Sequence, residues 1–279
     1  PPVQVPDGPD QSLHQDPRMK IALTIAGSDS GGGAGIQADL KTFNQFKVFG
    51  TSVITAITAQ NTKGVRAVHP VPPQIVRAQL EALAEDLPPA GFKTGMLATA
   101  ELVRMVAGAV TEFDWPNYVC DPVMVATSGD RLLDADAEAV IRENLVPLAA
   151  LVTPNLDEAA ILTGTDPRDP ESMEQAGRRL LELGAGAALV KGGHLTGDEV
   201  TDVLVTAGGV RSYRHPRINT RSTHGTGCTL SAAITAGLAA GRDVESAVTA
   251  GLDFVFRAIK SAPALGFGRG PLDHTVRAS

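Results

Sequence analysis

The stretch Asn219-Thr-Arg-Ser-Thr-His-Gly-Thr-Gly-Cys-Thr-Leu-Ser-Ala-Ala233 passes from polar residues and two glycines directly into an Ala- and Leu-rich segment. This order is typical of a loop that opens a helix, and no residue ends the predicted helix before Gly241. The first turn of a helix has unpaired backbone N–H groups and the positive end of the helix dipole, so it attracts anions. The stretch therefore predicts an anion site at a helix N-terminus.

The residue types in this turn suggest what the anion is for. Gly225 and Gly227 lack the side chains that would keep a phosphoryl group away from the backbone. Cys228 lies where the dipole is expected to lower the pKa of a thiol, which could make it a base or a nucleophile near neutral pH. A glycine-rich loop beside a buried, inert cysteine is the alternative, and spacing alone favours neither interpretation.

Length and charge limit the class of protein. The 279 residues, 43% of them hydrophobic, suit one large α/β domain or two small ones, and no composition break marks a second domain. The 24 basic and 31 acidic residues give a net charge of −7, and no Lys/Arg block indicates a nucleic-acid surface. We expect a small-molecule substrate and no nucleic-acid partner.

The remaining composition indicates the compartment. Cys120 and Cys228 are too few for a disulfide framework and lack metal-ligand spacing, so a reducing cytoplasm is expected. No segment has the apolar length of a membrane span, which predicts a soluble protein. Residues 1–18 contain five prolines and no apolar period, so we interpret them as a disordered leader before a single domain over 19–279.

Near the N-terminus the pattern is strand, glycine-rich loop, helix. A buried strand is predicted over 21–27, a loop over 28–33, and a helix to about residue 46. Gly33 to Ala38 also match the dinucleotide fingerprint G-x-G-x-x-A. No acidic residue occurs between Leu40 and Leu80 to hold a ribose, and the loop lacks a P-loop ending. The loop is therefore expected to close over a small substrate.

Polar side chains follow several predicted strands at the edge where open parallel sheets bind ligands. Gln60 has a donor and an acceptor with which to read a heteroaromatic amine, although a surface amide is the simpler interpretation. Asp121 needs a cation or another partner. Asn155 and Glu158 resemble a capping box or, alternatively, help organise hydrated Mg²⁺. Lys191, beside two glycines, could reach phosphate oxygens or be a surface lysine.

The other elements alternate along the chain. Met96 and Val123 fall at strand ends where a ligand ring could rest, although either is more commonly a core residue. Helices are predicted over 73–87, 99–113, 154–162, 171–183 and 244–261, with strands at 52–58, 118–121, 151–153 and 188–191 and a hairpin around residues 208–209. This alternation predicts a mostly parallel sheet with helices on both faces.

Taken together, the motifs resemble the ribokinase-like superfamily, and within it the bacterial hydroxymethylpyrimidine/phosphomethylpyrimidine kinases of thiamine biosynthesis. The resemblance covers roughly residues 20–270. It is carried by 23–41, 53–56 (Val-Ile-Thr-Ala), 60–62 (Gln-Asn-Thr), 94–97 (Thr-Gly-Met-Leu), 153–159 (Thr-Pro-Asn-Leu-Asp-Glu-Ala), 190–194 (Val-Lys-Gly-Gly-His) and 219–229. It implies a three-layer α/β/α domain with a mostly parallel central sheet.

The resemblance also implies an activity and a set of roles. Such enzymes use ATP and Mg²⁺ to phosphorylate 4-amino-5-hydroxymethyl-2-methylpyrimidine and then its monophosphate. Gln60 matches the residue that binds the aminopyrimidine, in a pocket with Gly27, Asp29, Met96 and Val123.

The catalytic and nucleotide positions follow from the same match. Gly225, Thr226, Gly227 and Cys228 would form the anion hole, with Cys228 where sugar kinases carry an aspartate base. The remaining matches are to nucleotide contacts at Asp121, Asn155, Lys191 and Thr226, and to the magnesium region at Asp121 and Glu158.

Three alternatives remain. A pyridoxal kinase of the same superfamily is the nearest, followed by a dinucleotide-dependent oxidoreductase and a non-catalytic ligand-binding regulator on the kinase fold. A homodimer is expected from the resemblance alone. The loops 28–33 and 127–132 are the candidates for mobile covers, because glycine lowers the cost of rearrangement.

Overall fold

The computed structural model describes residues 19–124, 135–193, 195 and 197–278, and the account below concerns these residues. Two predictions lie outside them: the disordered leader over 1–18 and the mobile cover over 127–132.

The described part of the chain contains one nine-stranded sheet in the order β3-β2-β1-β4-β5-β6-β7-β8-β9. The six strands from β2 to β7 are parallel, whereas β3, β8 and β9 pair antiparallel at the two edges. The predicted mostly parallel sheet is therefore confirmed. The strands are β1 Ile21–Asp29, β2 Phe49–Asn61, β3 Gly64–Pro70, β4 Gly91–Thr94, β5 Tyr118–Cys120, β6 Leu151–Val152, β7 Ala187–Val190, β8 Glu199–Thr206 and β9 Gly209–Pro216.

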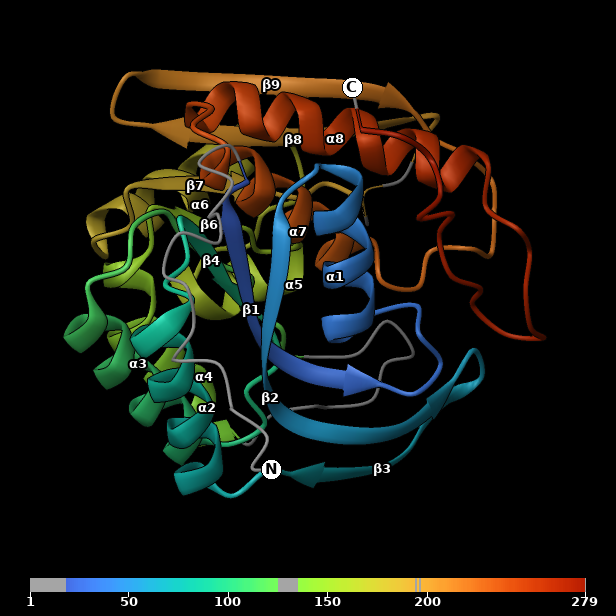
Figure 1. The fold of residues 1–279 in the computed structure, drawn as a ribbon. Coiled ribbons are helices and arrows are strands. Elements are labelled where there is room, and N and C mark those ends of the chain that lie inside the picture. The colour runs from blue at the N-terminus through green and yellow to red at the C-terminus, as the bar shows by residue number, and fades with distance from the viewer. Residues whose placement is uncertain (1–18, 125–134, 194, 196, 279) are drawn as a thin grey trace, which may run out of the picture.

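Helices cover both faces of the sheet, which confirms the three-layer arrangement (Figure 1). One layer contains α1 Gly35–Gln45, α7 Thr226–Ala239 and α8 Val244–Lys260. The other contains α2 Pro73–Asp86, α3 Ala100–Phe113, α4 Ala135–Asn144, α5 Leu156–Thr163 and α6 Pro170–Glu182. In Figure 1, α2 to α4 lie to the left of β1 and β2, and α1 lies to the right.

The central strands are apolar on both faces because each face is covered by helices. Leu23, Ile25 and Phe92 pack toward α2 and α3, whereas Ala22 packs toward α1 and α7. Helix α7 is buried nearly all round, since it lies between the sheet and α8. This packing holds the first turn of α7 at the carboxyl ends of the parallel strands.

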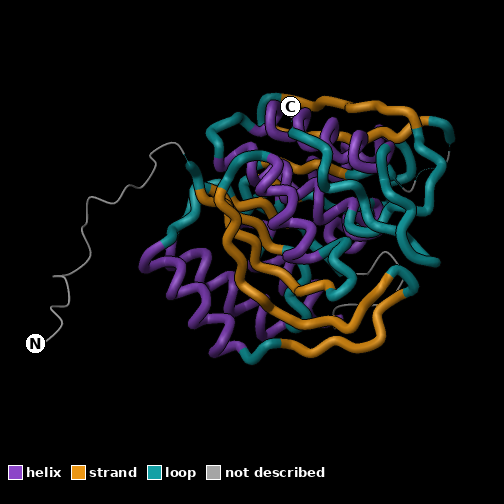
Figure 2. The backbone as a smooth tube through the Cα atoms, turned by 45° about the vertical axis from the view of Figure 1, so that its right-hand side comes forward, coloured by secondary structure: helices purple, strands orange, loops and turns teal. Residues whose placement is uncertain are grey.

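The β2–β3 hairpin differs from the prediction. Strand β2 continues through Gln60 to Asn61 and turns back into β3, which the sequence reading did not predict. The turn needs Gly64, whose φ is +147°. Figures 1 and 2 show this hairpin extending past the end of β1. Helix α4 was also not predicted.

Candidate active site

A cleft of about 660 Å³ lies at the carboxyl ends of the parallel strands. Every residue predicted to act in the site lines it, so the fold brings together residues that are up to 201 positions apart in the chain (27 to 228). These residues are Gly27, Asp29, Gln60, Met96, Asp121, Val123, Asn155, Glu158, Lys191, Gly225, Thr226, Gly227 and Cys228.

Two helix N-termini meet in the cleft. Gly225 begins α7 with φ +83°, and a Cβ there would overlap the carbonyl of Gly33, just before α1. A Cβ at Gly35 would overlap the carbonyl of Gly27. Neither Gly225 nor Ala34, the residue that precedes α1, has a side chain that could cap its helix. The glycines of the dinucleotide-like fingerprint therefore allow α1 to pack against the start of α7, and neither helix start has a capping side chain that would compete with a ligand.

Cys228 does not have the low pKa expected of a thiol at a helix N-terminus. Burial raises its pKa to about 12, and this effect exceeds the opposing influence of Lys93 and of the Gly35 N–H, which donates a hydrogen bond to the sulfur. The prediction of a lowered pKa was therefore wrong. At neutral pH the residue is a neutral thiol that faces the anion site.

Asp121 is the centre of a buried charge cluster beneath α7. Its carboxylate accepts hydrogen bonds from Lys191 Nζ at 3.2 Å, Ser231 Oγ at 3.0 Å and Thr153 Oγ1 at 3.3 Å. Burial raises its pKa, but the charges of Lys191 and Lys93 and these hydrogen bonds outweigh burial, so the pKa is lowered. The pKa of Lys191 is raised, because Asp121 and Glu158 outweigh the opposing effect of burial. Lys191 is thus a fixed cation at the cleft and not a surface lysine.

Asn155 and Glu158 form the capping box that the sequence suggested. The Asn155 side chain accepts from the Glu158 N–H at 2.9 Å, and Glu158 accepts from the Asn155 N–H at 2.8 Å. Burial raises the pKa of Glu158 to about 7, and the nearby Asp121 carboxylate adds to this rise. No group of three or more His, Cys, Asp or Glu side chains in the described ranges could hold a metal ion. An ion bound here would keep most of its waters.

The amide of Gln60 is held at the substrate end. Its Oε1 accepts from Thr58 Oγ1 at 3.2 Å, and its Nε2 lies 3.3 Å from Nε2 of His224. The same His224 nitrogen lies 2.8 Å from Oδ2 of Asp29. His224 was not predicted as a site residue, although it adjoins Gly225 in the 219–233 stretch.

Asp29 lines the cleft and also holds the loop before α1. Its carboxylate accepts N–H hydrogen bonds from Gly31 at 2.7 Å, Gly33 at 3.0 Å and Ala34 at 2.9 Å, besides contacting His224. Burial alone would raise its pKa, but these hydrogen bonds lower it. Both oxygens therefore hold the loop before α1, and the role of Asp29 in binding substrate stays a prediction.

An apolar floor lies beside Gln60. Met96 packs with Ala56, Ala98 and Val123, and a Cβ at Gly27 would lie 2.5 Å from Cε of Met96. Gly27 thus lets the Met96 side chain pack directly against the backbone of β1. Met96 and Val123 lie where the sequence placed them, at one side of the cleft.

The opposite end of the cleft is lined by apolar residues that the sequence did not single out. Helix α8 contributes Leu252, Val255, Phe256 and Ile259, with Leu230 from α7. Their spacing along α8 is that of any amphipathic helix, so periodicity could not separate this wall from ordinary core. The wall suits a flat heteroaromatic base.

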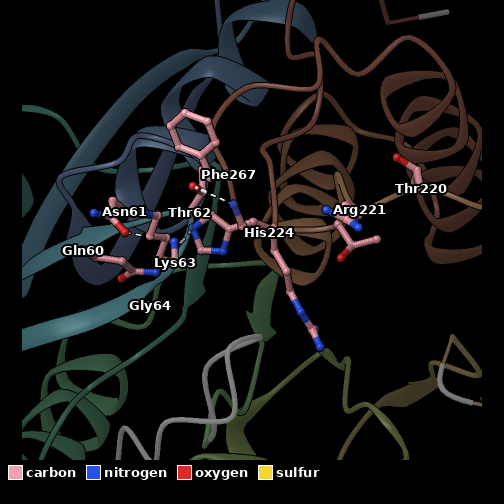
Figure 3. Close-up of a pocket in the computed structure, with 12 residues that line it drawn as sticks. Gln60, Asn61, Thr62, Lys63, Gly64, Thr220, Arg221, His224 and Phe267 are labelled. Carbon is pink, nitrogen blue, oxygen red and sulfur yellow. Dashed lines mark hydrogen bonds between the residues drawn. The ribbon is translucent and has the colours of Figure 1, made fainter.

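A second cavity, of about 590 Å³, adjoins the substrate end and shares Gln60 and His224 with the cleft (Figure 3). Lys63, Arg221 and Arg269 line it, and none of its described lining residues is acidic. The ring of Phe267 is 89% exposed, with Lys63 Nζ 5.4 Å from its centroid. The substrate end of the cleft therefore has a positively charged vestibule.

With this sheet order, and with an anion site at the carboxyl ends of its parallel strands, the molecule is a small-molecule kinase of the ribokinase-like class. The chain belongs to the phosphomethylpyrimidine kinase family, because the model of that family matches residues 29–273. A helix that could cross a bilayer does not occur in the described ranges.

Three similar proteins illustrate this membership. A hydroxymethylpyrimidine/phosphomethylpyrimidine kinase from Rhizobium meliloti is 52% identical over 260 residues, covering 92% of this chain and 97% of the relative. The thiamine biosynthesis bifunctional protein ThiED from Geobacter sulfurreducens is 48% identical over 94% of this chain, which spans only 53% of that protein. The crystal structure of an ADP complex of Bacillus subtilis pyridoxal kinase superposes with a TM-score of 0.85 at 38% identity, covering 92% of this chain and 98% of that chain.

Proposed function

We propose that this chain uses ATP to phosphorylate 4-amino-5-hydroxymethyl-2-methylpyrimidine and then converts the monophosphate to the diphosphate, in thiamine diphosphate biosynthesis. The observation that carries the proposal is the placement of three parts in one cleft. The Gln60 amide and its apolar floor lie at one end, the start of α7 and Lys191 lie in the middle, and the α8 wall lies at the other. The name of the Rhizobium meliloti relative supports the same reaction.

In the first step the hydroxymethyl oxygen attacks the γ-phosphorus of ATP. The new P–O bond forms as the bond to ADP breaks, and the hydroxyl proton leaves the oxygen. In the proposed complex, the first turn of α7 from Gly225 to Cys228 and the ammonium of Lys191, which line the same cleft, would stabilise the charge that gathers on the transferred group. Positioning and charge stabilisation supply most of the catalysis in phosphoryl transfer.

Cys228 is the proposed acceptor of that proton. Because burial raises its pKa to about 12, only a small fraction of the thiol is ionised at neutral pH. General-base help is worth about 10²- to 10⁴-fold, so an enzyme without the thiol keeps measurable activity. The second acceptor is a phosphate that is already largely ionised near pH 7. Replacing Cys228 should therefore slow the first step more than the second in single-turnover assays, and equal losses would contradict the base role.

Mg²⁺ is the proposed companion of ATP. Asp121 and Glu158 are two buried carboxylates that share Lys191, whereas Lys93, whose charge also acts on Asp121, is paired with Asp39; this charge balance suits a hydrated cation. When bound, Mg²⁺ would neutralise charge on the phosphate oxygens. Both carboxylates are already held by hydrogen bonds, Glu158 by the Asn155 N–H and Asp121 by Lys191, so each would act on the ion through its waters.

A pyridoxal kinase is the alternative, and it is favoured by one observation. The Bacillus subtilis pyridoxal kinase has the same fold at 38% identity. The ratio of kcat/KM for the two acceptors decides between the assignments. A higher value for the hydroxymethylpyrimidine supports the proposal, and a higher value for pyridoxal assigns the chain to the alternative.

We also propose a homodimer and a cytoplasmic location. Ile57 and Val68 lie on the β2–β3 edge with 55% and 39% of their surface exposed, which is an apolar area that a second copy could cover. Light scattering at several concentrations tests this, and a monomer throughout would contradict it. Cys120 and Cys228 are both free thiols, as the reducing cytoplasm requires.

A further inference from the structure

Lys93 is a fully buried lysine in the middle of the sheet. Its Nζ lies 3.0 Å from Oδ1 of Asp39 on α1, and both side chains are 0% exposed. Thr24 Oγ1 donates to the other Asp39 oxygen at 2.6 Å. Thr24 and Lys93 are paired in register on the neighbouring strands β1 and β4, so both face α1. The ammonium is thus held at a fixed position by two elements.

Stability alone does not account for this pair. The face of the sheet around it is apolar, formed by Ala22, Phe43, Ala232 and Ala236. Removing two charges from water costs several kcal/mol per ion, roughly, and well-packed apolar residues commonly replace a buried pair without loss. A role for the charge itself is therefore worth testing.

The ammonium lies beneath the floor of the cleft. A Cβ at Gly95, which lines the cleft, would be 3.8 Å from Lys93 Nζ. On α1 the Gly35 N–H contacts the sulfur of Cys228, and Asp39 lies one helical turn further along the same face. Helix α7 packs directly on β4. The cation is consequently close to Cys228, on the side away from solvent.

We propose that Lys93 is a positioning residue for Cys228: held by Asp39 and Thr24, its ammonium places a fixed positive charge beneath the cleft floor, on the buried side of the Cys228 sulfur. The inference rests on the proposed role of Cys228 as proton acceptor. No part of it requires contact between Lys93 and a substrate.

The charged groups around Cys228 determine whether a substitution raises or lowers the pKa of its thiol. Asp39 and Asp121 disfavour the thiolate, whereas Lys93 and Lys191 favour it. Among the groups that oppose burial, Lys93 has the largest effect on the pKa of Cys228. Removing Lys93 should therefore raise that pKa further, and removing Asp39 should lower it.

Alkylation of Cys228 by iodoacetamide measures this without any turnover, so its outcome is independent of the proposed function. The nucleotide-free protein is treated at pH 8.5, and modification of the Cys228 peptide is followed by mass spectrometry, with the buried Cys120 as an internal reference. Each unit of rise in pKa lowers the thiolate fraction tenfold and raises its intrinsic reactivity about threefold, a net slowing of about threefold.

We expect Lys93→Met to slow alkylation threefold or more and Asp39→Asn to accelerate it. A purely structural role would loosen the site in both variants and accelerate both. Alkylation of folded Lys93→Met at or above the wild-type rate overturns the inference, as does a slower Asp39→Asn.

The double variant Asp39→Asn/Lys93→Met has no unpaired buried charge, so it keeps the test usable if a single variant does not fold. Lys93 has a larger effect on the pKa of Cys228 than Asp39 does. Cys228 in the double variant should therefore be alkylated more slowly than in the wild type and faster than in Lys93→Met. A rate equal to or above that of the wild type contradicts the inference.

Discussion

Gly227 is the position where the anion site can be blocked while the fold is kept. A Cβ there would lie 3.3 Å from Lys191 Nζ and 3.9 Å from Oδ2 of Asp121, in open cleft. The methyl group of Gly227→Ala would occupy space that a phosphate oxygen needs in order to reach both Lys191 and the first turn of α7. We expect kcat to fall about 10²- to 10³-fold, which is the loss of one preorganised donor, about 2.7–4 kcal/mol.

Stability should change in the opposite direction. Gly227 is the second residue of α7, and alanine is favoured over glycine within a helix by up to about 1 kcal/mol. The melting temperature of Gly227→Ala should therefore stay the same or rise by a few degrees. Thermal unfolding and steady-state kcat are measured on the same preparation.

Two matched glycine substitutions separate a blocked anion site from a general effect on the fold. Gly108→Ala adds a methyl to α3 with no atom within 4 Å, so it should stabilise without changing kcat. Gly225→Ala should unfold the loop as well as inactivate, because φ is +83° and the Cβ overlaps Gly33. If Gly227→Ala keeps more than a third of the wild-type kcat, the anion site is not at the start of α7.

Three further predictions concern the pH dependence of the first step, the salt dependence of kcat/KM and the stability of the fold in acid. Since the pKa of Cys228 is about 12, the rate of the first phosphorylation should rise by up to about tenfold for each pH unit between about pH 7 and 9. Cys228→Ala should abolish this rise, and a flat wild-type profile excludes the base role. Replacing Arg221 and Arg269 by alanine should lower kcat/KM for the anionic monophosphate roughly several-fold at low salt, and this loss should disappear at high salt. The value for the neutral pyrimidine should not change. Equal losses for the two acceptors would contradict electrostatic attraction at the vestibule. Burial lowers the pKa of His274 from 6.5 to about 4, so the unfolded chain takes up this proton at a higher pH than the folded protein does. The free energy of unfolding should therefore fall by up to about 3 kcal/mol as the pH drops from 6.5 to 4. Denaturant titrations of His274→Gln should lack this loss, and a pH dependence equal to that of the wild type would refute the explanation.

Most of the architecture could be predicted because its signals are local. Alternation of strands and helices, with glycines at the turns, indicates a parallel sheet covered on both faces. Strand β3 was missed because its residues from Arg66 onward are all exposed, so it lacks the apolar pattern of a buried strand. The continuation of β2 past Gln60 depends on pairing with β3, which local propensity does not contain.

The site residues were also predictable only where their signals are local. Residues at strand ends and in the α7 turn could be found from their positions alone. His224 meets Asp29 across 195 residues, and Ser231 meets Asp121 across 110, so only the folded chain brings them together. The expected low pKa of Cys228 was wrong because the helix dipole was weighed without burial, which dominates in the folded protein.

The most direct measurement is to incubate the purified protein with Mg-ATP and 4-amino-5-hydroxymethyl-2-methylpyrimidine and to separate the products by chromatography. A parallel reaction contains pyridoxal. The account predicts that the monophosphate appears first and the diphosphate follows. Monophosphate alone would contradict the second step, phosphorylation of pyridoxal alone would assign the alternative activity, and no product from either acceptor would refute the proposed kinase.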